Sequence, residues 1–93
     1  MKSILQDERR CFICGSYEWL EEHHVFGGTA NRKISEANGF KVFLCHYCHN
    51  EPPRGVHHNK EKRLWLQRKC QEKYESMGHS REEFISLIGK NYL

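Results

Sequence analysis

Long apolar runs are missing from this sequence. No segment approaches the roughly 20 apolar residues of a membrane span, and the first ten residues hold no apolar core of a signal peptide. Internal repeats and low-complexity tracts are lacking as well. We therefore expect a cytoplasmic protein that does not enter a membrane. In that reducing compartment, cysteines bind metals more often than they form disulfides.

Apolar residues are also scarce overall. They make up 38% of the 93 residues, against 29% charged residues, and so short a chain buries only a modest fraction of its surface. A stabilising element besides the core is expected. Five Phe, four Tyr and two Trp nevertheless argue against disorder. The net charge of +3 is compatible with a nucleic-acid partner but does not require one.

The order of residue types predicts one α+β domain over residues 1–93. Residues 18–26 and 40–45 are rich in aromatic and β-branched types and are predicted to be strands. The stretch 29–39 between them is predicted to be a polar loop with one helical turn around 35–38. Residues 60–77 and 81–88 are predicted to be C-terminal helices, and Ser80 with Glu83 forms the capping-box pattern of the second. Residues 1–10 are expected to form a short arm or helical turn.

Four cysteines form two pairs with the same spacing. Cys11 and Cys14 make one C-x₂-C knuckle, and Cys45 and Cys48 make the other. Two such knuckles can complete a tetrahedral Cys₄ zinc site, which leaves no open position and is therefore expected to be structural. The alternative is a redox dithiol or a set of free buried thiols. The fifth, Cys70, lies mid-helix without a knuckle partner and is expected to be a small buried side chain.

Histidines gather around these knuckles. His23 and His24 are adjacent on a predicted strand, so their side chains point to opposite faces and cannot both bind one metal from a regular strand. His49 directly follows Cys48, and a zinc ion joining the knuckles would bring it towards His23. An open site with few protein ligands suits Mg²⁺ or another divalent ion and phosphodiester hydrolysis.

Two segments together resemble a known family. Glu22-His23-His24-Val25 and the run from Leu44 to Asn50, Leu-Cys-His-Tyr-Cys-His-Asn, resemble the signature of HNH endonucleases, and the wider pattern looks like small HNH proteins of phages and prophages. The resemblance covers about residues 11–60. It implies a small zinc-stapled ββα-metal core, treble-clef-like, with the C-terminal helices added to it.

The resemblance also implies roles for single residues. His23 and His49 match the positions of metal ligands, and His24 matches the general base that takes a proton from the attacking water. An imidazole suits that role because its unperturbed pKa lies near neutral pH. His57 is either a third ligand of the catalytic divalent ion, a phosphate contact or a plain surface residue. His46, His58 and His79 are expected at the surface.

One position departs from the family pattern. Where HNH proteins usually carry the asparagine that orients the base, this sequence has Phe40. Asn31 or Asn38 in the preceding segment is the candidate substitute, and the sequence leaves open which of them acts.

Basic residues suggest DNA as the partner. Arg32, Lys33 and Arg54 are expected to meet phosphates near the histidines, whereas the lysines and arginines of residues 60–77 are expected mainly to be a solvated helix face. Phosphate contacts carry no sequence information, so little specificity is expected. A homodimer, or phage packaging or recombination proteins, are further candidate partners. The competing hypothesis is a non-catalytic zinc module that binds nucleic acid or protein, which would need the cysteines but not His24 and His49.

Overall fold

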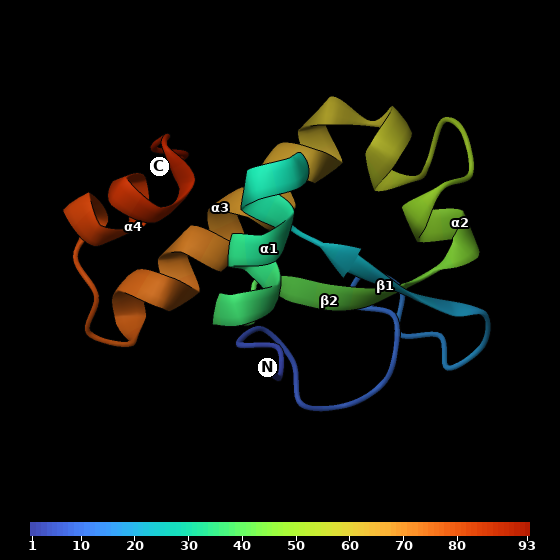
Figure 1. The fold of residues 1–93 in the computed structure, drawn as a ribbon. Helices are drawn as coiled ribbons and strands as arrows, with labels where there is room; N and C mark the ends of the chain where they lie inside the picture. The colour runs from blue at the N-terminus through green and yellow to red at the C-terminus, as the bar shows by residue number, and fades with distance from the viewer.

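The computed structural model describes residues 1–93 and places a two-stranded sheet among four α-helices. In Figure 1 the sheet lies between a short helix at one end of the molecule and the C-terminal helix at the other. The predicted α+β class is confirmed. The helical segments, in chain order, are α1 (Thr29–Asn38), α2 (His46–His49), the 3₁₀ turn η1 (Val56–His58), α3 (Lys60–Ser76) and α4 (Arg81–Ile88).

The sheet is an antiparallel pair of β1 (Leu20–His24) and β2 (Lys41–Cys45). Both predicted strands are present. β1 starts later than predicted because Trp19, with a φ of 51°, interrupts the extended backbone. In the register, Leu20 lies opposite Cys45 and His23 opposite Val42. The end of β2, where the second knuckle begins, is thereby brought beside the segment that precedes β1.

The predicted loop at 29–39 is wrong, because ten of its residues form α1. Its apolar residues Ala30, Ile34 and Ala37 have the i, i+4, i+7 spacing of a helix, and a buried polar contact also holds the helix in place. The hydroxyl of Ser35, fully buried, donates to the carbonyl of Phe26 at 3.0 Å and accepts from the amide of Phe26 at 3.3 Å. Gly39 ends the helix in the left-handed conformation, with a φ of 73°. The contact with Phe26 therefore anchors the helix to the segment that follows β1.

Residues 1–10 form an arm without regular helix that lies along β2. The amide of Ile4 donates to the carbonyl of Gly39 at 3.0 Å, and the side chain of Gln6 accepts from the amide of Phe43. A Cβ on Gly39 would lie 2.3 Å from the carbonyl oxygen of Lys2, so the arm packs here only against glycine. The arm covers backbone groups of β2 that would otherwise form an open sheet edge.

The two C-terminal helices match their predicted bounds within one residue. Asn59 caps α3 by accepting from the amide of Lys62 at 3.0 Å. The predicted capping box of α4 is present, because Ser80 and Glu83 each accept a hydrogen bond from the other's backbone amide. None of the helices is both long and apolar enough to cross a membrane.

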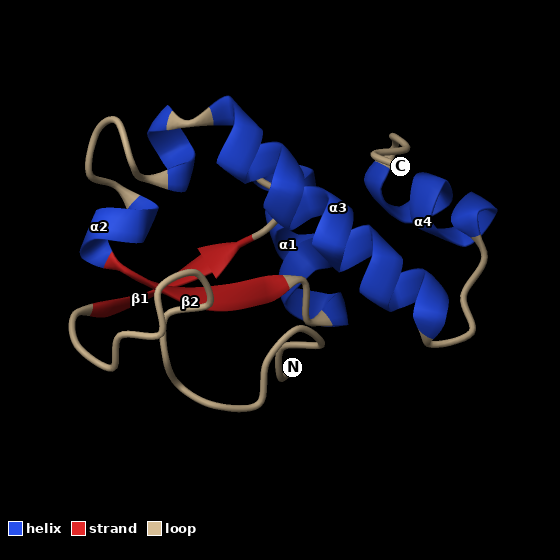
Figure 2. Cartoon of the chain, turned by 180° about the vertical axis from the view of Figure 1, so that it is seen from behind, coloured by secondary structure: helices blue, strands red, loops and turns tan.

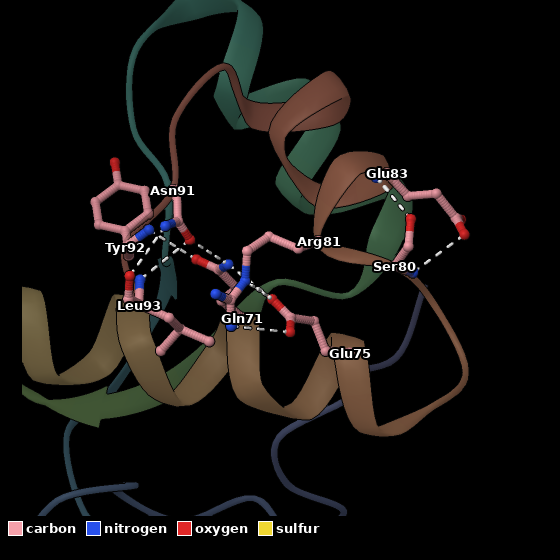
Figure 3. Close-up of polar contacts among 8 residues, drawn as sticks. All are labelled: Gln71, Glu75, Ser80, Arg81, Glu83, Asn91, Tyr92 and Leu93. Carbon is pink, nitrogen blue, oxygen red and sulfur yellow. Dashed lines mark hydrogen bonds and ion pairs between the residues drawn. The ribbon is translucent and has the colours of Figure 1, made fainter.

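Polar contacts fasten the C-terminal tail to α3, as Figure 3 shows. The side-chain amide of Gln71, fully buried, donates to Asn91 and Glu75 and accepts from the backbone amide of Tyr92, each at 2.8 Å. Arg81 at the start of α4 forms an ion pair with Glu75 at 3.2 Å. α4 and the tail are thus held against the middle of α3.

The core is an aromatic cluster where α3 and α4 meet the sheet. Phe26, Phe40 and Phe84 are essentially inaccessible to solvent, and Tyr74 and Tyr92 pack around them. Phe40 lies with its ring centroid 5.7 Å from that of Phe26 and 5.3 Å from that of Tyr74. The position where the resembling family carries an asparagine is therefore part of the core in this protein.

Candidate metal centre and histidine site

The four knuckle cysteines converge on one point. Their sulfur atoms all lie within 4.8 Å of one another, and Cys14 Sγ is 3.6 Å from Cys45 Sγ. A tetrahedral site with Zn–S distances of about 2.3 Å has sulfur–sulfur edges of about 3.8 Å. The cluster can therefore hold a structural metal ion such as zinc. All four sulfurs meet in a single group, an arrangement that a two-cysteine redox site does not need.

Local hydrogen bonds shape the first knuckle. The amide of Gly15 donates to the carbonyl of Cys11 at 2.9 Å, and Gly15 adopts a φ of 82° that favours glycine. The amide of Cys11 donates to the carbonyl of Ser16 at 2.8 Å. Phe12 then joins the knuckle to the sheet, because its amide donates to the carbonyl of Phe43 at 2.9 Å. The first knuckle is thus fixed beside β2, which leads into the second.

The protonation behaviour of the thiols fits metal binding. Burial alone would raise the pKa of Cys11, but hydrogen bonds from the amides of Cys14, Cys45 and Ile13 lower it to about 7. Burial raises the pKa of Cys48, and the neighbouring thiols of Cys45 and Cys11 raise it further, because a second thiolate in the same small space is costly without a cation. Cys70 lies apart, fully buried in α3, and burial raises the pKa of its thiol, as expected for a packing residue.

Three histidines form a second cluster next to the cysteines. One ligand nitrogen of each of His23, His49 and His57 lies within 4.8 Å of the others. The Nε2 atoms of His49 and His57 are 2.9 Å apart, and the ring of His23 stands edge-on to both other rings. The structure therefore brings His57 to the pair predicted as metal ligands.

The fold explains how residues far apart in sequence meet here. The strand alternation of β1 turns His23 towards α2 and His24 towards the opposite face. His49 ends α2, one residue after the buried Cys48, so the cysteine cluster sets its position. His57 comes from η1, where Gly55 lets the chain pass against the end of α2. A Cβ on Gly55 would lie 2.8 Å from backbone atoms of residues 49–51.

His23 is the least accessible of these imidazoles. It is 6% exposed, and its buried Nε2 has no hydrogen-bond partner. Burial, reinforced by the nearby imidazoles of His49 and His57, lowers the pKa of His23 to about 3, so the ring is neutral at physiological pH. A buried polar atom without a partner is destabilising. A neutral nitrogen aimed at two other imidazoles is therefore suited to a metal ion.

The carboxylate of Glu21 orients the imidazole of His49 through its Nδ1 atom. Glu21 Oε1 lies 2.7 Å from Nδ1 of His49 and accepts from the side-chain amide of Asn50 at 3.0 Å. The hydrogen bond from His49 is the main reason that the pKa of Glu21 lies below its usual range. A proton held on Nδ1 leaves Nε2 of His49 free to bind a metal. The sequence prediction missed Glu21, although it lies two residues before His23 and so on the same face of the strand.

Replacing Glu21 by glutamine is expected to weaken divalent-metal binding at the histidine cluster about 10- to 100-fold, because the imidazole of His49 loses its charged orienting partner. Titration of Mn²⁺ or Ni²⁺ into protein already loaded with structural zinc measures this affinity. Glu22→Gln is the matched control, since Glu22 is the next residue on the opposite face of β1 and is expected to leave the affinity unchanged. Equal affinities for the two variants would contradict the role of Glu21.

His24 faces a different set of charged groups. Its Nε2 lies 3.6 Å from Glu36 Oε1 on α1 and 3.8 Å from Glu22 Oε1. An ion pair with Lys41 holds the pKa of Glu36 below its usual range, so this carboxylate is charged beside the imidazole. Because Glu36 lies in the segment predicted to be a loop, the sequence carried no signal of this contact.

Neither candidate asparagine hydrogen-bonds to His24. The side-chain amide of Asn31 donates to the carbonyl of Ile88 at 3.2 Å and ties α1 to α4. The side-chain amide of Asn38 donates to the carbonyl of Ile34 at 2.9 Å within α1. His24 Nε2 instead lies within 4 Å of two carboxylates, although it is buried and makes no hydrogen bond to either. Both asparagines thus have structural contacts of their own.

Two basic side chains lie near His24, whose Nε2 atom is itself buried. Arg32 and Lys33 are exposed on α1 and line a depression that His24, Glu36 and the start of α1 complete. Arg54 lies elsewhere, in a groove beside the cysteine cluster. On α3, Arg63 and Arg68 hydrogen-bond to the carbonyls of Val56 and Tyr92, so part of the predicted solvated face stabilises the fold. Two of the three predicted phosphate contacts therefore share a surface with His24.

The remaining histidines lie outside the histidine cluster. The side chain of His46 is 48% exposed and points between Glu21 and Glu51, and His58 is exposed. His79 stacks on the ring of Tyr74 and pairs with Glu83.

Comparison of the chain with protein-family models, with curated proteins and with solved structures finds no match. The site must therefore be interpreted from its own chemistry.

Proposed function

We propose that this protein is a metal-dependent endonuclease of the ββα-metal (HNH) kind that hydrolyses phosphodiester bonds in DNA. The observation that carries the proposal is the meeting of three imidazoles, from His23, His49 and His57, in one group that could hold a divalent ion. On the other face of β1, His24 lines a depression together with Arg32 and Lys33. Two antiparallel strands followed by a short helix that supplies a ligand also support the treble-clef-like description of the core.

The donor set indicates which ion fits. Three neutral imidazoles suit first-row transition metals, whereas Mg²⁺ prefers oxygen ligands. His23, His49 and His57 would hold the ion, and the buried, unpartnered Nε2 of His23 supports that assignment. A divalent ion there would supply Lewis acidity that stabilises the charge developing on the scissile phosphate and on the leaving oxygen. We therefore expect activity with Mn²⁺, Co²⁺ or Ni²⁺ to exceed that with Mg²⁺.

The chain's own residues perform the proton transfer and the positioning. The imidazole of His24 takes a proton from the water whose oxygen attacks phosphorus, while the bond from phosphorus to the 3′ oxygen breaks. The carboxylates of Glu36 and Glu22 stabilise the imidazolium that forms. In this proposal Glu36 takes the orienting role that asparagine has in the family. Arg32 and Lys33 hold the neighbouring phosphates.

Plasmid nicking tests the proposal. Zinc-loaded protein is incubated with supercoiled DNA and one added ion at a time, Mg²⁺, Mn²⁺, Co²⁺ or Ni²⁺, and the conversion to nicked and linear forms is followed on a gel. We expect cleavage with at least one transition metal and none after chelation of the added ion. Binding of DNA without cleavage under every ion would favour the non-catalytic zinc module instead.

A further inference from the structure

Two large aromatic side chains are exposed beside the cysteine cluster. Trp19 is 69% exposed and Tyr47 44% exposed, and their ring centroids are 6.0 Å apart. Trp19 directly precedes β1 and Tyr47 lies in α2, and Figures 1 and 2 both show these elements at the end of the molecule remote from α4. Neither ring belongs to the core, and neither lines the depression at His24.

The backbone at Trp19 is unusual for so large a residue. Trp19 is the one non-glycine residue of the chain with a positive φ, 51°, a conformation that costs a bulky side chain free energy. The conformation is fixed from α2, because the carbonyl of Trp19 accepts from the amide of His46 at 3.0 Å. Because the indole is exposed, its packing contributes little free energy to offset that cost. This combination indicates that the ring acts on something outside the fold.

Cationic side chains share the groove that the two rings line. Arg54 and Lys62 line it together with Cys14, Cys45 and Cys48 of the cysteine cluster, and Glu18 is the acidic side chain there. Arg54 is exposed, and the ammonium group of Lys62 donates to the backbone carbonyl of Arg54 at 3.0 Å, so the Lys62 side chain lies against this residue. Aromatic faces next to paired cations match the two parts of a nucleotide, its base and its phosphate.

We propose that Trp19 and Tyr47 form a stacking platform for an unpaired nucleobase, with Arg54 and Lys62 holding the adjacent phosphates. The occupant is a single-stranded DNA segment, because the base faces of a duplex are already covered by neighbouring bases. The inference deepens the proposed function, on which it rests for the choice of DNA. It names the form of the substrate, DNA with a single-stranded stretch near the cleavage site.

Binding without cleavage tests the platform. Fluorescence anisotropy of a labelled oligothymidylate of about 12 nucleotides is measured with zinc-loaded protein and no other divalent ion. Trp19→Ala is expected to weaken binding about 10-fold or more, and Trp19→Phe to restore most of it. Tyr17→Ala is the matched control. Tyr17 is 65% exposed in the same loop, but it contacts Glu8 and does not line the groove. Zinc content and thermal unfolding confirm that each variant is folded.

Two further readouts separate stacking from general attraction. In a Trp65→Phe background Trp19 is the sole indole, and its fluorescence is expected to be quenched by single-stranded DNA and much less by a duplex of equal length. Arg54→Gln is expected to weaken binding of every sequence alike. It should also reduce the slope of log affinity against log salt concentration by about one, as the loss of one phosphate contact does.

The platform is refuted by an unchanged affinity in Trp19→Ala, or by an indole signal that responds equally to duplex. Either result would assign the surface to another occupant, such as a protein partner. The test is independent of catalysis. A protein that binds through Trp19 but never cleaves would overturn the proposed function alone, whereas cleavage of single-stranded substrates unaffected by Trp19→Ala would overturn the platform alone.

Discussion

Replacement of Cys45 by serine is expected to leave the chain unfolded at room temperature, even with zinc present. Cys45 contributes one of four sulfurs that converge within 4.8 Å, and it joins β2 to α2. Binding of structural zinc contributes about 10–16 kcal/mol in small zinc domains, which equals or exceeds the stability of about 5–15 kcal/mol typical of folded proteins. Far-UV circular dichroism with a thermal ramp, together with the zinc content of the purified protein, measures the loss.

Cys70→Ala is the matched control for this prediction. Cys70 is equally buried, but it lies in α3 away from the cluster. Its replacement is expected to keep one equivalent of zinc and a cooperative unfolding transition at a somewhat lower temperature. Chelation of zinc from the parent protein should reproduce the unfolding seen with Cys45→Ser. A zinc-free parent that keeps its melting temperature would contradict the structural role of the metal.

His24→Ala is expected to slow plasmid cleavage about 100- to 10,000-fold, the range usual for loss of a general base. Divalent-metal affinity should stay close to that of the parent, because His24 lies on the opposite face of β1 from the histidine cluster. Single-turnover cleavage, with the metal affinity measured in parallel, tests both expectations.

His58→Ala controls for the removal of any histidine. His58 is exposed, one residue from His57, and outside the histidine cluster, so its loss should leave the rate near the parent value. The cleavage rate of Glu36→Gln should lie between those of His24→Ala and His58→Ala, because this replacement keeps the size of the side chain but removes the charge beside His24. Full activity of His24→Ala would show that another group takes the proton from water.

The histidine cluster depends on the cysteine cluster through adjacent residues. Cys48 belongs to the cysteine cluster and His49 to the histidine cluster, and both lie in α2, four residues long. A helix that short has little stability of its own. The cysteine cluster therefore orders the backbone that presents His49, and loss of the structural metal should remove the second site as well. For this reason a chelation experiment must distinguish unfolding from loss of an active-site ion.

Local signals in the sequence were sufficient for several features. The spacing of Cys11 with Cys14 and of Cys45 with Cys48 reflects how a tight turn aligns two sulfurs, and the structure brings all four together. The Ser80 capping box operates within one helical turn, and α4 starts and ends at the predicted residues. Strand alternation alone predicts that the side chains of His23 and His24 point to opposite faces, and in the structure they face different neighbours.

Features that depend on distant partners escaped sequence reasoning. The prediction of a loop over 29–39 overlooks the helical spacing of Ala30, Ile34 and Ala37 in α1, and the contact of Ser35 with Phe26 reaches outside the helix. The place of Phe40 in the aromatic core depends on the packing of α3 and α4 against the sheet, which the local sequence does not reveal. Without α1, the carboxylate of Glu36 could not be assigned to His24.

By itself, the sequence determined the cysteine pairs, both strands, the two C-terminal helices and the opposition of His23 and His24, because each follows from turn geometry, strand alternation or capping over a few residues. The tertiary structure alone decided that His57 joins His23 and His49, that Glu21 orients His49 and that carboxylates, not asparagines, face His24. These contacts join residues from different elements. They arise when the sheet register and the end of α2 bring those elements together, and neither residue type nor spacing encodes that meeting.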